Sequence, residues 1–126
     1  MKYADAPSAI DWLCRAFGFE RHLIVEGEGN IIEHAQLTLG GGMIMLGSVR
    51  VSPFDEMQKP PKATNGVVTQ SAYIVVNDLD AHYARALAAG AEIVLEPEDQ
   101  NYGGRLYSCR DPEGHLWNFG SYNPWT

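Results

Sequence analysis

Hydrophobic residues recur at helical spacing near the start of the chain and again in its second half. In residues 7–17, the side chains of Ile10, Leu13 and Phe17 fall on one face of a helix. Gly18 follows directly and suits the left-handed position that commonly ends a helix. The spacing therefore predicts a helix over residues 7–17.

The second helical stretch repeats the plan of the first. Asp5 precedes the first helix, and Asp78 stands in the same place before a helix that the pattern predicts up to Ala89. Gly90 follows the second helix as Gly18 follows the first. These matching signals predict a tandem of two similar units.

Short stretches of alternating or β-branched residues surround both helices and predict strands. Residues 40–42 are three glycines that form a hairpin bend, and residues 111–114 form a tight turn before the last strand. Only four residues precede Asp5, so the first strand of the first unit is nearly absent. Residues 96–104 are expected to form a polar loop. The predicted strands cover residues 22–26, 32–39, 43–47, 71–76, 91–95, 105–110 and 115–122.

The resulting order is β-α-β-β-β, twice, which predicts an α+β fold. The length of 126 residues suits one domain, with unit one over residues 1–47 and unit two over residues 70–126. Residues 48–69 between them contain several prolines and form the connector. A loop of this length inside a domain is usually functional or mobile.

Composition and charge narrow the classes of function. Hydrophobic residues make up 45% of the chain and charged residues 20%, which is typical of a globular protein. The net charge of −7 and the scattered basic residues argue against nucleic acid as a partner. No apolar run reaches the ~18 residues that span a membrane, and no signal peptide is recognised. The two cysteines have no metal-like spacing. A cytoplasmic protein with no membrane contact is expected.

Two segments resemble a known family. The segment from Tyr102 to Phe119, with its Asp-Pro-Glu-Gly turn at residues 111–114, is similar to the terminal signature of the vicinal-oxygen-chelate superfamily. This superfamily includes glyoxalase I, extradiol dioxygenases and bleomycin-resistance proteins. The helix over residues 9–19 resembles that of the glyoxalase-like and bleomycin-resistance-like members. The resemblance covers essentially the whole chain and implies two curled half-barrels around a cleft, but it does not specify an activity.

The resemblance also implies where a metal would bind. Metal-dependent members place ligands on the first strand and on a late strand of each unit. The matching positions here are Gln36, Ser71 and Asn118, and the fourth falls before Met1. Catalytic divalent metals prefer imidazole and carboxylate ligands, and none of these residues supplies either. We therefore expect no metal and no other cofactor, and the sequence identifies no catalytic residue.

Alternation of side chains along the strands extends the cleft that the resemblance implies. It places further candidate residues beside the three metal-equivalent positions and turns Trp117 and Phe119 toward the helices. Two aromatic residues on loops could stack on a planar ligand. The candidate ligand-binding residues are His34, Gln36, Thr38, Ser71, Tyr73, Asn118, Phe54 and Tyr102.

The function expected from this pattern is metal-free binding of a small molecule. By its resemblance to bleomycin-resistance proteins, the chain would confer antibiotic resistance by sequestering a planar organic compound, as a homodimer. The alternative is a glyoxalase-like isomerase or lyase that acts on a small carbonyl substrate. A third possibility is a structural or regulatory dimer without a ligand. Whether any catalysis remains is left open by the sequence.

Overall fold

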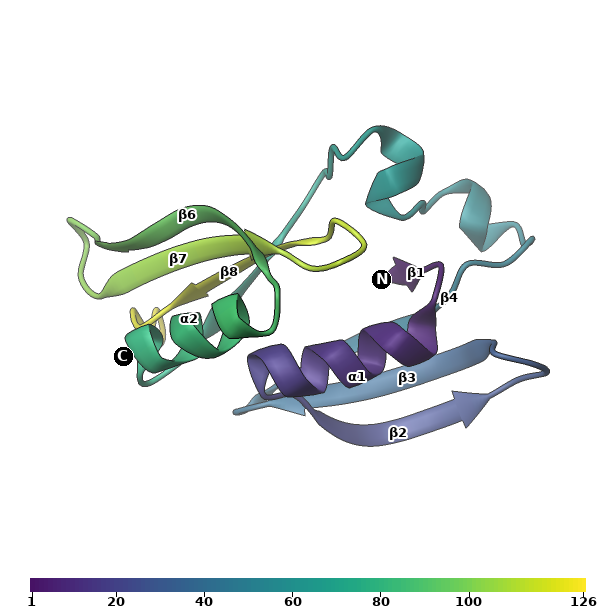
Figure 1. Cartoon of the computed structure of the whole chain (residues 1–126), viewed down its shortest axis with the longest axis horizontal. Helices are drawn as coiled ribbons and strands as arrows, with labels where there is room; N and C mark the ends of the chain where they lie inside the picture. The colour runs from purple at the N-terminus through teal and green to yellow at the C-terminus, as the bar shows by residue number, and fades with distance from the viewer.

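The computed structural model describes residues 1–126 and contains the order β-α-β-β-β twice (Figure 1). The first sheet has the strand order β1-β4-β3-β2 and the second has β5-β8-β7-β6. In each sheet the first strand of the unit runs parallel to the last, and the other pairs are antiparallel. The predicted α+β fold of two tandem units is confirmed. The elements are β1 Lys2–Tyr3, α1 Ala6–Phe17, β2 Glu20–Glu26, β3 Ile32–Leu39, β4 Gly42–Ser48, β5 Ala72–Val75, α2 Leu79–Ala88, β6 Glu92–Asp99, β7 Arg105–Arg110 and β8 Leu116–Gly120.

The two helices begin in the same way. The side chain of Asp5 accepts a hydrogen bond from the Ser8 backbone N–H at 3.2 Å, and that of Asp78 accepts one from Ala81 at 3.1 Å. Each carboxylate thus satisfies a backbone donor that the helix itself leaves unpaired. The helix α1 ends at Gly18, whose φ of 86° lies in the left-handed region that glycine adopts readily. The predicted capping residues therefore have the expected roles.

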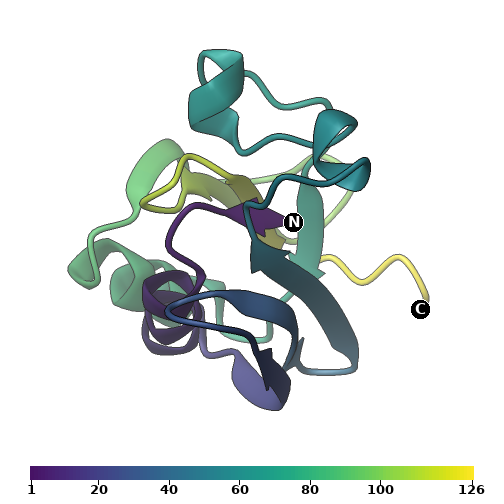
Figure 2. The ribbon, with the colours of Figure 1, turned by 90° about the vertical axis from the view of Figure 1, so that its right-hand side faces the viewer.

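Both helices lie between the two sheets and share one core (Figures 1 and 2). The ring of Phe17 on α1 lies 4.7 Å from that of Phe119 and 5.4 Å from that of Trp117, both on β8 of the second sheet. The α1 helix also packs on its own sheet through residues such as Leu13. Trp117 and Phe119 are fully buried, so the expectation that they face the helices is confirmed.

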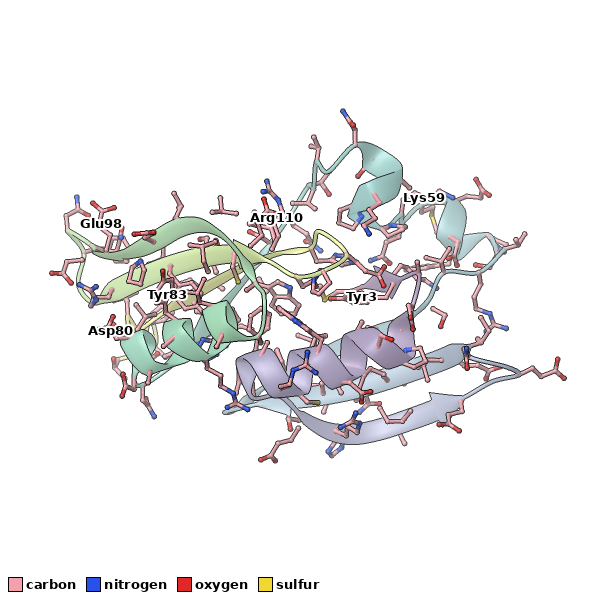
Figure 3. The ribbon with its side chains drawn as sticks, in the orientation of Figure 1. Tyr3, Lys59, Asp80, Tyr83, Glu98 and Arg110 are labelled. Atoms are coloured by element: carbon pink, nitrogen blue, oxygen red, sulfur yellow. The ribbon has the colours of Figure 1, made fainter.

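The short strand β1 is held by the turn at the other end of the chain. The Tyr3 hydroxyl donates a hydrogen bond of 2.6 Å to the buried carboxylate of Asp111 (Figure 3). The Glu113 carboxylate accepts from the backbone N–H groups of Ala4 and Asp5 at 2.6 and 2.9 Å. The His115 ring donates to the Lys2 carbonyl oxygen at 2.8 Å. The strand β1 can therefore consist of only two residues, because the second unit supplies hydrogen-bond partners beyond those of β4.

The side chains of α2 also contact the C-terminal end of α1. Arg85 donates to the carbonyl oxygens of Arg15 and Cys14 at 2.8 and 3.2 Å. The His82 ring bonds to the Phe17 carbonyl at 2.9 Å and to the Tyr107 hydroxyl at 2.6 Å. His82 is thus a partly buried residue that joins α1, α2 and β7.

The connector between β4 and β5 forms an arm that stands away from the sheets (Figures 1 and 2). Its buried carboxylate, Asp55, accepts from the Arg50 backbone and the Ser52 hydroxyl and pairs with Lys2 at 3.1 Å. Together, the Ser52 and Arg50 hydrogen bonds and Lys2 lower the pKa of Asp55 to about 2. Lys59 extends from the arm into the open (Figure 3). The ion pair between Lys2 and Asp55 therefore anchors the arm near β1.

The strand β6 departs furthest from its predicted bounds. The strand β6 continues to Asp99, through residues that the sequence pattern favours as a polar loop. Pro97 lies where the register between β6 and β7 shifts, on an edge strand. Both circumstances tolerate a residue without a backbone N–H, and this explains the difference.

Neither helix is long and apolar enough to pass through a membrane.

Candidate functional site

Each sheet has one face packed against the helices and one open face. Because opposite residues on adjacent strands share a face, the pairing of β3 with its neighbours defines the open face of the first sheet. Gln36 lies opposite Met45 and Leu23, and Thr38 lies opposite Met43. This first open face comprises Glu20, Leu23, Val25, His34, Gln36, Thr38, Met43 and Met45.

Half of the residues on the first open face are apolar. Met45 is 53% exposed, and Leu23 and Met43 are exposed as well, although all three are large hydrophobic residues. The His34 ring donates to the Gln36 side-chain oxygen at 3.0 Å, and the Gln36 amide donates to the Met43 sulfur at 3.4 Å. The predicted residues His34, Gln36 and Thr38 therefore lie together, among unbranched and branched apolar side chains.

The second open face carries a chain of polar side chains. The Ser108 hydroxyl donates to the Asn118 side-chain oxygen at 2.6 Å. The Asn118 amide nitrogen donates to the Ser71 hydroxyl at 2.8 Å and to the Ala72 carbonyl oxygen at 3.0 Å. Ser108 is buried beneath this chain, while Ser71 is exposed at its end. Two of the predicted residues, Ser71 and Asn118, are thus directly bonded.

An aromatic group adjoins this polar chain. Tyr73 lies opposite Asn118, and its hydroxyl donates to the Tyr122 carbonyl oxygen at 2.7 Å. A side chain at Gly120 would collide with the Tyr73 ring, so this glycine leaves the space that the ring occupies. The ring of Tyr102 packs edge-on against Tyr122 at 5.2 Å. Partial burial, together with the nearby Tyr102, raises the pKa of Tyr73.

The residues present do not fit the divalent metal of the metal-dependent relatives. Amide and hydroxyl oxygens are weak ligands for such ions. The side-chain oxygens of Asn118 and Gln36 also already accept hydrogen bonds from Ser108 and His34. No group of three or more His, Cys, Asp or Glu side chains could hold a metal ion.

A single chain does not bring the two groups of candidate residues together. Because the helix-covered faces of both sheets pack into one core, the two open faces lie on the outside and point apart (Figure 2). Phe54 belongs to neither face: it lies exposed on the connector arm, with the Lys2 ammonium 5.7 Å from its ring centre. Within one chain, the predicted site residues therefore lie on two separate faces and on the connector arm.

Two hollows of the chain lie elsewhere. One, of about 550 Å³, lies between α1 and the turn at residues 111–113. The other, of about 410 Å³, lies between the β3–β4 hairpin and the N-terminal end of α2. None of the predicted site residues lines either hollow, so they are separate from the open faces.

Sequence reasoning missed several residues of these faces, among them Met43, Met45, Ser108 and Tyr122. Met43 and Met45 could have been predicted from the hairpin register, because a turn at residues 40–41 places them opposite Thr38 and Gln36. Ser108 could have been predicted in the same way, from its pairing with Asn118. Tyr122 could also have been assigned, because the strand predicted over residues 115–122 puts it on the same face as Asn118, although the observed strand β8 ends at Gly120.

Known proteins resemble the chain in sequence and in structure. An uncharacterized protein of Mycobacterium tuberculosis is 34% identical over 116 residues, which is 92% of this chain and 68% of that protein. The crystal structure of TioX from Micromonospora sp. ML1 is 35% identical, with a TM-score of 0.76, and the match covers 98% of this chain and 94% of TioX. TnmS3, an antibiotic binding protein from Streptomyces sp. CB03234, shares the fold at 20% identity, with a TM-score of 0.64 over 95% of this chain and 90% of TnmS3.

The family match extends over most of the chain. The model of the Glyoxalase/Bleomycin resistance protein/Dioxygenase superfamily matches residues 3–119, from β1 to β8. This range includes both β-α-β-β-β units and the turn at residues 111–114 whose pattern carries the resemblance. The chain therefore belongs to the Glyoxalase/Bleomycin resistance protein/Dioxygenase superfamily.

Proposed function

We propose that this protein binds and sequesters a planar organic compound without a metal. The observation that carries the proposal is the state of the metal-equivalent residues. Gln36, Ser71 and Asn118 are bonded to their own neighbours, beside exposed apolar and aromatic side chains. Apolar walls with a few polar groups are the usual composition of a small-molecule site. TnmS3, described as an antibiotic binding protein, supports ligands of the antibiotic class.

The binding protein acts as a homodimer in this proposal. Each open face is a half-site, and a two-fold arrangement sets the first open face of one copy opposite the second open face of its partner. Two equal clefts then form, each with aliphatic side chains such as Met45 on one wall and Tyr73 on the other. Exposed side chains of the connector arm support a second contact surface, because Val51, Phe54 and Met57 have no apolar cover within the chain.

Ligand binding is tested by thermal unfolding with two matched compounds. Fluorene is planar and aromatic, while perhydrofluorene has the same carbon skeleton without aromaticity or planarity. A ligand present at 100 times its Kd raises the free energy of unfolding by ~2.7 kcal/mol. We expect fluorene to raise the melting temperature more than perhydrofluorene does. Equal shifts, or none with a wider panel of planar compounds, would contradict sequestration of planar ligands.

Two further measurements test the metal and the dimer. Elemental analysis of the purified protein is expected to find no stoichiometric zinc, nickel or iron. Conversion of the methylglyoxal–glutathione hemithioacetal after addition of these metals would instead support the glyoxalase-like alternative. Light scattering at micromolar concentration is expected to give the mass of two chains, and a monomer would contradict the shared cleft.

A further inference from the structure

The hydrogen bonds that link Ser108, Asn118 and Ser71 on the second open face donate in one fixed direction. The Ala72 carbonyl oxygen can only accept a hydrogen bond, so the group of Asn118 that lies 3.0 Å from it is the amide nitrogen. The side-chain oxygen of Asn118 therefore points to Ser108, whose hydroxyl must donate. Both amide hydrogens of Asn118 are used, one on Ala72 and one on Ser71. The orientation of this amide is set by the backbone and not by a ligand.

This direction determines what Ser71 offers. Its hydroxyl oxygen accepts from Asn118 at 2.8 Å, and its own hydrogen has no partner within the chain. A hydroxyl that accepts a hydrogen bond becomes a stronger donor, because bonds aligned head to tail polarise one another. Ser71 is exposed at the end of these hydrogen bonds, so its hydroxyl hydrogen is free to meet a ligand outside the sheet.

The neighbouring tyrosine does not compete for this role. The Tyr73 hydroxyl already donates to the Tyr122 carbonyl oxygen at 2.7 Å, which leaves its ring as the contact surface. Tyr73 follows Ser71 by two residues, so their side chains lie on the same face at roughly 7 Å spacing. A planar molecule that lies on the Tyr73 ring is therefore within reach of the Ser71 hydroxyl.

We propose that Ser71 is the specificity-determining donor of the site, and that the ligand is a planar ring system bearing a hydrogen-bond acceptor at its edge. A carbonyl oxygen or an unprotonated ring nitrogen has this chemistry. Asn118 and Ser108 are positioning residues, which hold the Ser71 hydroxyl in the donating direction. This inference rests on the proposed binding function and names the class of compound that the cleft selects.

Three tricyclic probes of nearly equal shape test the inference: 9-fluorenone carries an acceptor, carbazole carries an N–H donor, and fluorene carries neither. Their Kd values are measured by quenching of tryptophan fluorescence, with EDTA present to exclude adventitious metal. We expect the wild type to bind 9-fluorenone about fivefold more tightly than fluorene, the gain typical of one neutral hydrogen bond. Carbazole should gain no such advantage.

Substitutions of Ser71, Asn118 and Ser108 distinguish a hydrogen bond donated by Ser71 from nonspecific contact with the probe. Ser71→Ala should remove the preference for 9-fluorenone while keeping the affinity for fluorene, and Ser71→Thr should restore the preference. Asn118→Asp turns the amide into an acceptor that draws the Ser71 hydrogen inward, so the preference should shift toward carbazole. Ser108→Ala should weaken the preference through Asn118 without any contact with the probe.

The outcomes distinguish failure of this inference from failure of the proposed function. If all three probes bind equally well, or if Ser71→Ala retains the preference for 9-fluorenone, the donor role is wrong although planar binding stands. If the wild type prefers carbazole, Ser71 accepts through its remaining lone pair and the donor role is wrong. If none of the three binds, the planar-ligand function fails and the donor role fails with it.

Discussion

The two halves of this molecule share an order of elements but differ in how deeply their helices are buried. Seven residues of α1 are buried, whereas α2 buries only Leu79 and Ala86. The equivalent capping aspartates show that both helices begin in the same way. The difference comes from position, since α1 packs on its own sheet and also reaches Trp117 and Phe119 of the other. Two units with the same order of elements therefore need not contribute equally to the stability of the fold.

The open faces differ as well. The first is lined by aliphatic residues such as Leu23 and Met45, with one short polar pair, His34 and Gln36. The second combines the Tyr73 ring with the polar chain through Asn118. We therefore expect stability to depend mainly on the residues between the sheets, and the proposed ligand binding to depend on the outer faces. Variants can separate these two contributions.

The largest effect is expected from Trp117→Ala. The side chain is fully buried against Phe17 and Phe19, and its indole N–H donates to Asp111 at 3.0 Å. Truncation of such a residue costs ~3–5 kcal/mol of unfolding free energy. Urea unfolding measures the loss. An unchanged midpoint would show that the helix-covered face of β8 does not carry the core.

Trp117→Phe serves as the matched variant. It keeps most of the apolar volume but leaves the Asp111 carboxylate with one donor fewer. Its cost should be smaller than that of the alanine variant. A cost equal to that of Trp117→Ala would assign the effect to the hydrogen bond and not to packing.

The contrast between the helices is tested by two leucines. Leu13 on α1 is fully buried, whereas Leu87 on α2 is 49% exposed. Leu13→Ala should lower the unfolding free energy by ~2–5 kcal/mol, and Leu87→Ala should change it by only about 0.5 kcal/mol. Chemical denaturation of both variants provides the comparison. Similar losses would mean that α2 is buried as deeply as α1, for example through an interface with a second copy.

The contrast between the open faces is tested by binding of fluorene. Tyr73→Ala should raise its Kd several-fold, because aromatic stacking contributes roughly 0.5–1.5 kcal/mol beyond burial of area. Met45→Ala removes a flexible aliphatic contact from the other face and should weaken binding less. Fluorescence titration and the melting temperature of each free variant are measured together. A larger effect at Met45 would reverse the roles of the two faces.

The smallest effect concerns the contact between the helices at acidic pH. Burial, together with the Arg85 guanidinium, lowers the pKa of His82 below its ordinary 6.5, although the hydrogen bond to Phe17 opposes this shift. As the pH falls below 6.5, the unfolded chain takes up a proton that the folded chain resists, so stability is lost. His82→Gln should remove this part of the pH dependence. Unfolding of both proteins between pH 8 and pH 5 provides the test, and identical slopes would contradict it.

Most of the fold was predictable because local signals agree with it. The helix predicted over residues 7–17 is observed at Ala6–Phe17, and alternation correctly turned Trp117 and Phe119 inward. The extent of β6 was not predictable in the same way. Pro97 is read locally as a strand breaker, while the register shift that accommodates it depends on pairing with β7.

The candidate site was predictable only within each sheet. The family resemblance assigns Gln36 and Asn118 to the cleft, alternation adds residues such as His34 and Tyr73, and the strand pairing puts each set on one face of its sheet. It cannot assign the two faces to one side of the molecule, because that depends on where α1 packs. The contact of Phe17 with Phe119 joins the halves through their helix-covered faces and separates the open ones. Periodicity contains no information on such a contact.

The hydrogen bond between Tyr3 and Asp111 has a consequence for synthesis on the ribosome. The two residues are separated by 108 positions, so the second becomes available only after all of the first unit and most of the second have been translated. Until then β1 lacks the carboxylates of Asp111 and Glu113 that hold it, and the aromatic residues of α1 lack Trp117 and Phe119. The emerging first unit therefore exposes apolar surface until the second unit has been translated. Completion of the core coincides with the arrival of the last strand.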